Sequence, residues 1–255
     1  MPSVFAIAAH PDDIEFVMAG TMMRLKDAGY ELHYMTVANG SCGSSELDAG
    51  SIAQIRGDES RAAAAYLGAT YHPPLARDIE IFYDRPTLAR LGSIVRHVAP
   101  QILLTHSPQD YMEDHTNTCR LAVTAAFCRG MRNFPVDPPR EAIDTDVTIY
   151  HAQPHGNCDP LRQPIVPEHF VDVTSLFDRK TEMLVKHQSQ KAWLDRSQGM
   201  DSYVAAMREL NAEVGRLSGS FALAEGWRRH LHLGFSRADV DPLAAALAQR
   251  VLVRS

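Results

Sequence analysis

Short apolar runs that stop at polar turns alternate along this chain with segments of helical periodicity. The first run, residues 4–9, is long enough for a fully buried strand, and Pro11 ends it because proline cannot donate to a central ladder. Residues 18–25 then place apolar side chains at helical spacing, and Gly29 closes that segment. Strand, polar turn and helix in this order are typical of an α/β sheet whose ligands bind beyond the carboxyl ends of the strands.

The same alternation continues to the C-terminus and predicts an α/β protein. Further strands are expected at 31–37, 101–105, 147–150 and 169–173, with one or two short strands within 71–82. Helices are expected at 51–67, 86–98, 116–129, 174–187, 202–217 and 242–253. At 255 residues, a single domain over 1–255 is favoured, with 1–130 carrying the chemistry and 131–255 a more variable substrate or oligomer part.

Composition narrows the class of partner. An apolar fraction of 45% suits a globular core, and a net charge of −6 argues against nucleic acid or an anionic membrane as the main partner. No apolar run approaches the length of a membrane span, and the N-terminus lacks a basic region followed by an apolar one, which favours the cytoplasm. The four cysteines form no metal or disulfide framework, so we expect free thiols.

The first turn carries side chains that handle metals and protons. His10, Asp12 and Asp13 sit where the first strand breaks. A neutral imidazole and a carboxylate are ordinary ligands of a zinc-type cation, and one of two adjacent carboxylates can stay free to take a proton. Asp12 and Asp13 could instead simply cap the following helix.

A second polar cluster follows the strand at 101–105. It spans residues 106–115 and includes Asp110, Asp114 and His115. Because parallel strands end at the same edge of a sheet, we expect His10 and Asp13 to lie near His115. Two imidazoles and one carboxylate with an open position make the donor set of a catalytic metal site.

Two further segments are candidates for substrate contacts. Asn39 opens a glycine-rich loop at 39–45 that has neither a phosphate-loop nor a dinucleotide motif. Arg56 and Glu59 lie three apart on one helix face, where they form either a surface ion pair or a contact to substrate hydroxyls.

His10-Pro11-Asp12-Asp13 together with the later Asp114-His115 resembles the LmbE-like (PIG-L) superfamily of zinc-dependent N-deacetylases. The helix with Arg56 and Glu59, and the stretch from Lys180 to Gln190, also look like the family pattern. The resemblance covers about the first 130 residues well. It implies a Rossmann-like three-layer α/β/α fold with a mostly parallel sheet and a metal site at the C-terminal edge of the strands.

Position by position, the resemblance implies roles for the two clusters. His10, Asp13 and His115 would bind zinc, although two imidazoles and a carboxylate also suit Fe²⁺ or another divalent metal. Asp12 would be the general base, and Asp110 and Asp114 would be carboxylates that orient the imidazoles. Arg56, Glu59 and Asn39 would contact the substrate.

One position departs from the family pattern. Many members have a histidine three residues before the last ligand, where it polarises or protonates at the oxyanion, and this chain has Met112 there. His155, His230 and His232 are candidates to replace it, each set against the reading of an ordinary surface or packing histidine.

The predicted function is a metal-dependent hydrolase that removes an N-acetyl or similar group from an N-acetylglucosamine-type small molecule, with Asp12 activating metal-bound water. A hydratase of an unsaturated carboxylic acid on the same fold is one alternative. A non-catalytic Rossmann-type binding protein, whose metal is structural or absent, is another. A homo-oligomer is the default expectation for such an enzyme.

Overall fold

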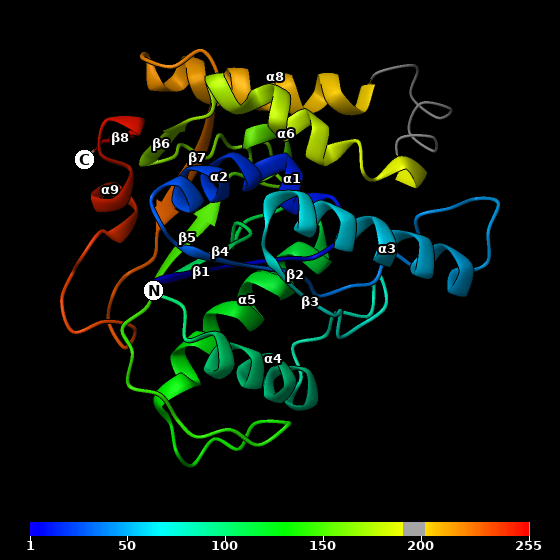
Figure 1. The fold of residues 1–255 in the computed structure, drawn as a ribbon, viewed down its shortest axis with the longest axis vertical. Helices are drawn as coiled ribbons and strands as arrows, with labels where there is room; N and C mark the ends of the chain where they lie inside the picture. The colour runs from blue at the N-terminus through cyan, green and yellow to red at the C-terminus, as the bar shows by residue number, and fades with distance from the viewer. Residues whose placement is uncertain (191–201, 255) are drawn as a thin grey trace.

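A computed structural model describes residues 1–190 and 202–254 (Figure 1). Within them one eight-stranded sheet has the order β3-β2-β1-β4-β5-β7-β6-β8. The strands are β1 Ser3–Ala8, β2 Glu31–Thr36, β3 Thr70–His72, β4 Ile102–Thr105, β5 Thr148–Ala152, β6 His169–Asp172, β7 Ala224–Arg229 and β8 Val251–Val253. Strands β1 to β5 run parallel to one another. The pairs β5 with β7, β7 with β6 and β6 with β8 are antiparallel, so the sheet is mostly parallel but mixed.

Strand β1 lies between β2 and β4 and is parallel to both. The chain therefore moves from β1 toward one edge of the sheet through β2, and later returns so that β4 pairs with the other edge of β1. This reversal of strand order opens a crevice at the carboxyl ends of β1 and β4, which is where open α/β sheets bind their ligands. The predicted pairing of the two polar strand ends is confirmed.

Helices cover both faces of the sheet (Figure 1). Helices α1, α2, α3, α6 and α8 pack on one face, and α4 and α5 on the other, as the layered α/β prediction requires. The helices are α1 Asp13–Val17, α2 Ala19–Asp27, α3 Ala49–Leu67, α4 Arg85–Val98, α5 Glu113–Phe127, α6 Phe177–Leu184, α8 Ser202–Ser218 and α9 Pro242–Leu247. No helix among the described residues is long and apolar enough to cross a membrane.

The alternation of side chains along β1 builds the two cores. Val4 and Ala6 point to the face of α2 and α3, whereas Phe5 and Ile7 point to the face of α4 and α5. All of these side chains are fully buried, because a central parallel strand is covered on both faces. This is why β1 is one continuous apolar run in the sequence.

Local signals set the ends of the long helices. The Asp48 carboxylate caps α3 by accepting from the amides of Gly50 and Ser51, and Gly68 ends α3 with a φ of 72°. Asp84 caps α4 in the same way, with Pro86 in the first turn.

The predicted elements differ from the structure at two places. Residues 242–253 are not one helix, because α9 ends at Leu247 and Val251–Val253 pairs with β6 as strand β8. The short strand expected within 71–82 is confirmed as β3, which ends at His72 because the prolines that follow interrupt the ladder. Strand β7 was not predicted, because its sequence, Ala-Glu-Gly-Trp-Arg-Arg, lacks a clean alternation.

A buried ion pair ties β7 to the first half of the chain. Lys180 and Glu225 are both completely buried, and Nζ lies 2.7 Å from Oε1. Glu225 also accepts from the amides of Gly20 and Thr21, in the first turn of α2, where the helix dipole favours a negative charge. Asn211 of α8 accepts a further hydrogen bond from Lys180.

Lys180→Met should destabilise the protein strongly, because it leaves a buried carboxylate without its counter-charge. We expect a loss of about 3–5 kcal/mol in the free energy of unfolding, measured by urea titration. The exposed Lys186 provides the control, since Lys186→Met should cost less than about 1 kcal/mol. Equal effects of the two substitutions would contradict this role of the ion pair.

Candidate metal centre and its cavity

The turn after β1 presents Asp12 and Asp13 in different directions. Asp12 has a φ of 108°, which is unusual for a residue other than glycine, and its side chain makes no capping bond to α1. Asp13 begins α1 and accepts a hydrogen bond of 2.7 Å from the His10 amide. Backbone strain of this kind collects at functional sites, where the surroundings must hold it in place. The helix-cap interpretation therefore does not account for Asp12.

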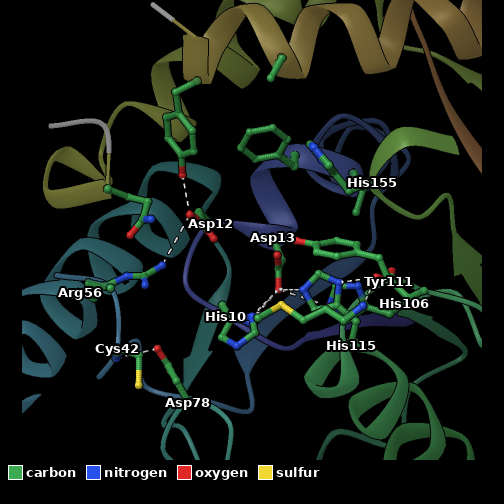
Figure 2. A pocket seen from close by; sticks show the side chains of 18 of the residues that line it. His10, Asp12, Asp13, Cys42, Arg56, Asp78, His106, Tyr111, His115 and His155 are labelled. Carbon is green, nitrogen blue, oxygen red and sulfur yellow. Dashed lines mark hydrogen bonds and ion pairs between the residues drawn. The ribbon is translucent and has the colours of Figure 1, made fainter. Parts of the chain in front are cut away.

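The loop after β4 brings a second group of imidazoles to the same point. His106 follows the strand directly, and His115 comes from the first turn of α5. Their rings stack with centroids 4.1 Å apart. The donor atoms of His10, Asp13 and His115 all lie within 4.8 Å of one another, so the predicted triad is assembled (Figure 2).

Both candidate imidazole ligands are held from behind by a carboxylate. His10 Nε2 lies 2.9 Å from Asp114 Oδ2, and His115 Nδ1 lies 3.0 Å from Asp110 Oδ1. The opposite nitrogens, His10 Nδ1 and His115 Nε2, lie 3.6 and 3.5 Å from Asp13 Oδ2. Carboxylates that fix the outer nitrogen of a metal-binding histidine are the usual second layer of such sites, so these residues fit a divalent cation.

A second combination, His106 with Asp110 and His115, is a weaker candidate. It also brings three donor groups within 4.8 Å of one another. However, His106 Nε2 already accepts a 2.9 Å hydrogen bond from the Ala9 amide, and Asp110 already holds the outer nitrogen of His115. In the first triad, His10 Nδ1 and His115 Nε2 both face Asp13 Oδ2, and that oxygen accepts from the His10 amide and keeps a second lone pair.

The charges around the triad favour a cation. Burial alone would lower the pKa of His10, but its hydrogen bonds to Asp114 and Asp13 outweigh burial and raise the pKa to about 10. Burial likewise opposes charge on His115, yet Asp13 and Asp110 raise its pKa. Burial would raise the pKa of Asp13, but His115 and His10 hold it well below its usual value. The protein thus stabilises positive charge at this point.

Asp12 lies beside the triad and is itself buried in protein contacts. Its Oδ2 accepts a 2.7 Å hydrogen bond from the Tyr203 hydroxyl and lies 3.5 Å from Arg56 Nη2 (Figure 2). Burial raises the pKa of Asp12, and the Arg56 guanidinium opposes that rise. A carboxylate with raised basicity next to a candidate cation site is placed to accept a proton.

These groups open into one cavity of about 440 Å³. Asp12 and Arg56 stand on one side of it, and Tyr111 and His155 on the other, with the triad between them (Figure 2). The cavity is lined by His10, Asp12, Asp13, Phe16, Val17, Cys42, Gly43, Arg56, Asp78, Ile79, His106, Asp110, Tyr111, Met112, His115, Gln153, His155, Gln190, Tyr203 and Ala206.

Several predicted site residues lie outside this lining. The side-chain oxygen Oδ1 of Asn39 accepts from the Ser41 amide, within its own loop. Glu59 accepts from the backbone amide and the hydroxyl of Ser189, at 2.8 and 2.6 Å. Asp114 stands behind His10. Glu59 and Asp114 therefore act on the cavity through the segments that they hold.

Of the three histidines offered as replacements at the Met112 position, the structure brings one to the cavity. His155 follows β5 and lines it. His230 Nδ1 lies 2.9 Å from His151 Nε2, and His232 lies 3.6 Å from Asp239. Strand β7 runs antiparallel to β5, so the chain leaves it away from the carboxyl edge of the parallel strands.

Sequence reasoning missed three groups of the site. His106 belongs to the polar cluster at 106–115, but the sequence pattern assigns it no role. Its position directly after β4 mirrors that of His10 after β1. Tyr203 reaches Asp12 across 191 positions of the chain, and no local pattern could indicate it. Asp78 accepts from the amides of Gly40 and Cys42 and so fixes the glycine-rich loop.

The fold and this site define an α/β protein with a candidate metal centre at the strand switch. Residues 5–127 match the family model described as PIG-L, GlcNAc-PI de-N-acetylase. That part of the chain therefore belongs to the PIG-L (LmbE-like) family, and the resemblance given by the two motifs is confirmed.

Two characterised relatives do different chemistry. The chain is 28% identical to the 4-oxalmesaconate hydratase of Pseudomonas putida over 186 residues, which cover 70% of each chain. It is 26% identical to the diacetylchitobiose deacetylase of Thermococcus kodakarensis over 193 residues, which cover 73% of this chain and 69% of that one. Relatives of this chain therefore include both kinds of enzyme.

Solved structures confirm the three-layer fold. The N,N'-diacetylchitobiose deacetylase of Pyrococcus horikoshii, bound to its inhibitor MPG, matches with a TM-score of 0.77 and 24% identity over 94% of this chain and 88% of that one. GalB, the 4-carboxy-2-hydroxymuconate hydratase of Pseudomonas putida, matches with a TM-score of 0.75 and 24% identity, over 94% and 99% of the two chains.

Asp110→Ala should weaken metal binding, because His115 loses the group that fixes its ring. We expect the dissociation constant for Zn²⁺ to rise about 10- to 100-fold, measured by competition with a chromogenic chelator. Glu113→Ala, three residues away and exposed, is the matched control and should leave the affinity within about twofold. An unchanged affinity of Asp110→Ala would remove Asp110 from the site.

Metal binding should release protons, because the raised pKa of His10 keeps the imidazole charged in the metal-free protein at neutral pH. The affinity should therefore climb as pH rises from about 7 toward 10. Calorimetry of Zn²⁺ binding in two buffers of different ionisation enthalpy measures the released protons. Asp114→Asn removes the anionic partner of His10, so this variant should release fewer protons when it binds Zn²⁺. An affinity independent of pH in both the wild type and the variant would contradict the assignment of His10 as a metal ligand.

Proposed function

We propose that this protein is a metal-dependent hydrolase that removes an N-acetyl or similar acyl group from a small amino-sugar substrate. The observation that supports it is the assembled triad of His10, Asp13 and His115 with the Asp12 carboxylate beside it, at the mouth of one cavity. Amide hydrolysis needs an activated water, a base and a stabilised oxyanion. A cation on the triad would supply the first and part of the third, and Asp12 supplies the base.

Zn²⁺ is the cation we propose for the triad, and when bound it would polarise an acyl carbonyl and lower the pKa of water. Asp12 takes the proton of the attacking water and hands it to the departing nitrogen. Tyr203 and Arg56 keep the Asp12 carboxylate in one orientation while it does so. The products are a carboxylic acid, acetate for an acetyl group, and a free amine.

A second donor must stabilise the oxyanion, because Met112 stands where many family members have histidine. Tyr111 and His155 line the wall across from Asp12, and Figure 2 shows the Tyr111 ring reaching over the triad toward Asp13. Burial and the Asp13 and Asp110 carboxylates raise the pKa of Tyr111 to about 12, so its phenol remains a donor at neutral pH. Tyr111 and His155 are therefore the groups that we propose for this role.

The charge of the cavity favours an amide substrate over an unsaturated polycarboxylate. Among its described lining residues, Arg56 carries the one permanent positive charge, and Asp12 already faces it. Four aspartates, Asp12, Asp13, Asp78 and Asp110, line the same space. A neutral N-acyl sugar enters such a cavity without repulsion, and its product ammonium is stabilised there.

Hydration of an unsaturated carboxylic acid remains the second candidate, because the relative at 28% identity is named as a hydratase. A hydratase needs no proton donor for a departing amine. The presence of methionine instead of histidine at position 112 would therefore impair a hydratase less than a deacetylase. The two functions differ in what they release, acetate in one case and nothing in the other.

The test is an acetate-release assay on N-acetyl amino sugars, including diacetylchitobiose, beside an ultraviolet assay for hydration of unsaturated dicarboxylic and tricarboxylic acids. Asp12→Asn should lower the rate of acetate release by about 10²- to 10⁴-fold while the zinc content stays unchanged. Asp58→Asn, an exposed aspartate on α3, should match the wild-type protein. Turnover of the acids alone would establish the hydratase, and sugar binding without turnover of either class would establish a binding protein.

A further inference from the structure

The glycine-rich loop lies directly across the Arg56 side chain. A Cβ added at Gly40 would meet Arg56 Cδ at 2.6 Å, and one at Gly43 would meet Arg56 Nη1 at 2.3 Å. Gly40 has a φ of 80°, which favours glycine, and a Cβ there would also meet Arg56 Cβ at 3.0 Å. A Cβ at Gly43 would instead displace the ends of the Arg56 and Gln190 side chains. Asp78 holds the loop in this place through the amides of Gly40 and Cys42. The guanidinium is thereby fixed against backbone rather than free to move.

Gln190, which follows Ser189 beyond helix α6, reaches the same corner. It is 7% exposed and lines the cavity, and its Oε1 atom is buried without a hydrogen-bond partner among residues 1–190 and 202–254. That oxygen lies 3.0 Å from the position that a Cβ on Gly43 would take. Arg56 Nη1 lies 2.3 Å from the same position. Glu59 holds the segment in place by accepting two hydrogen bonds from Ser189. A buried acceptor without a partner is costly, and it indicates a group that a ligand satisfies.

We propose that Gln190 is a specificity-determining residue that reads a hydroxyl group of the substrate together with Arg56. The hydroxyl donates to Gln190 Oε1 and accepts from Arg56 Nη1, beside Gly43. This inference rests on the proposed function and extends it by naming what the cavity recognises beyond the acyl group.

The chemistry of the corner selects a hydroxyl over a carboxylate. A carboxylate cannot donate to the Gln190 oxygen, and burying it there would set two acceptors against each other. The positive charge that would compensate is already engaged, because Arg56 Nη2 donates to the Pro11 carbonyl and lies 3.5 Å from Asp12 Oδ2. A polyol such as a sugar presents groups that donate and accept at once, so it satisfies both sides of the corner.

The experiment measures binding of a free amino sugar, which keeps the ring hydroxyls and cannot be deacetylated, to the zinc-loaded protein by calorimetry. A set of monodeoxy analogues, each lacking one hydroxyl, is titrated in parallel. Gln190→Leu should weaken binding of the parent sugar about tenfold, which corresponds to one buried hydrogen bond. One deoxy analogue should bind wild type and Gln190→Leu equally, because the group read by Gln190 is then missing. Gln188→Leu, an exposed glutamine in the same segment, should bind as wild type does.

Two further variants keep the test sharp. Gln190→Glu retains an acceptor and should bind the parent sugar within about threefold of wild type. Gly43→Ala should weaken it as much as Gln190→Leu, since the added methyl displaces both partners. With the N-acetylated sugar, Gln190→Leu should raise KM and leave kcat nearly unchanged, because it removes binding that is equal in the ground and transition states.

The inference is overturned if the wild-type protein binds none of the amino sugars, or if Gln190→Leu and Gln188→Leu bind every analogue alike. Loss of the proposed function would look different. Sugar binding that depends on Gln190, without release of acetate from the N-acetylated sugar, would refute the hydrolase and leave the hydroxyl-reading corner standing.

Discussion

One carboxylate oxygen, Asp13 Oδ2, is the point on which the site converges. It accepts from the His10 amide at 2.7 Å and faces nitrogens of His10, His106 and His115 at 3.3 to 3.6 Å. The convergence is possible because β1 and β4 are parallel neighbours that end at one level of the sheet. A buried anion among three imidazoles draws positive charge to this place. The parallel pairing of β1 and β4 therefore determines both the topology at the centre of the sheet and the grouping of the site residues.

The second half of the chain serves this arrangement from a distance. Glu225 and Lys180 hold β7 and α6 against the start of α2, and Tyr203 from α8 reaches the Asp12 carboxylate. The turn with Asp12 is strained at a φ of 108°, and strain of this kind persists only where neighbours on several sides oppose its relaxation. The family match ends at residue 127, yet a contact with the proposed base comes from beyond it.

What the sequence could predict follows from which signals are local. The strand ends at His10 and near His115 were predictable, because a buried parallel strand is a continuous apolar run and its polar end is visible beside it. The role of Tyr203 was not predictable, because its partner, Asp12, lies 191 positions away in the sequence. His230 and His232 are absent from the described lining of the cavity and lie instead beside His151 and Asp239. Strand β7 is antiparallel to β5, and the sequence of such an irregular strand does not indicate its direction in the sheet.

The shared oxygen of Asp114 has a consequence beyond orienting one ring. Oδ2 accepts from His10 Nε2 at 2.9 Å and also from the Ile79 amide at 2.7 Å, while Ile79 is held at a φ of 63°, which β-branched residues rarely adopt. Ile79 lines the cavity and is 61% exposed. One carboxylate oxygen thus anchors both the His10 ring and the backbone of the cavity wall at Ile79. A displacement of Ile79 would therefore also disturb the group that orients His10.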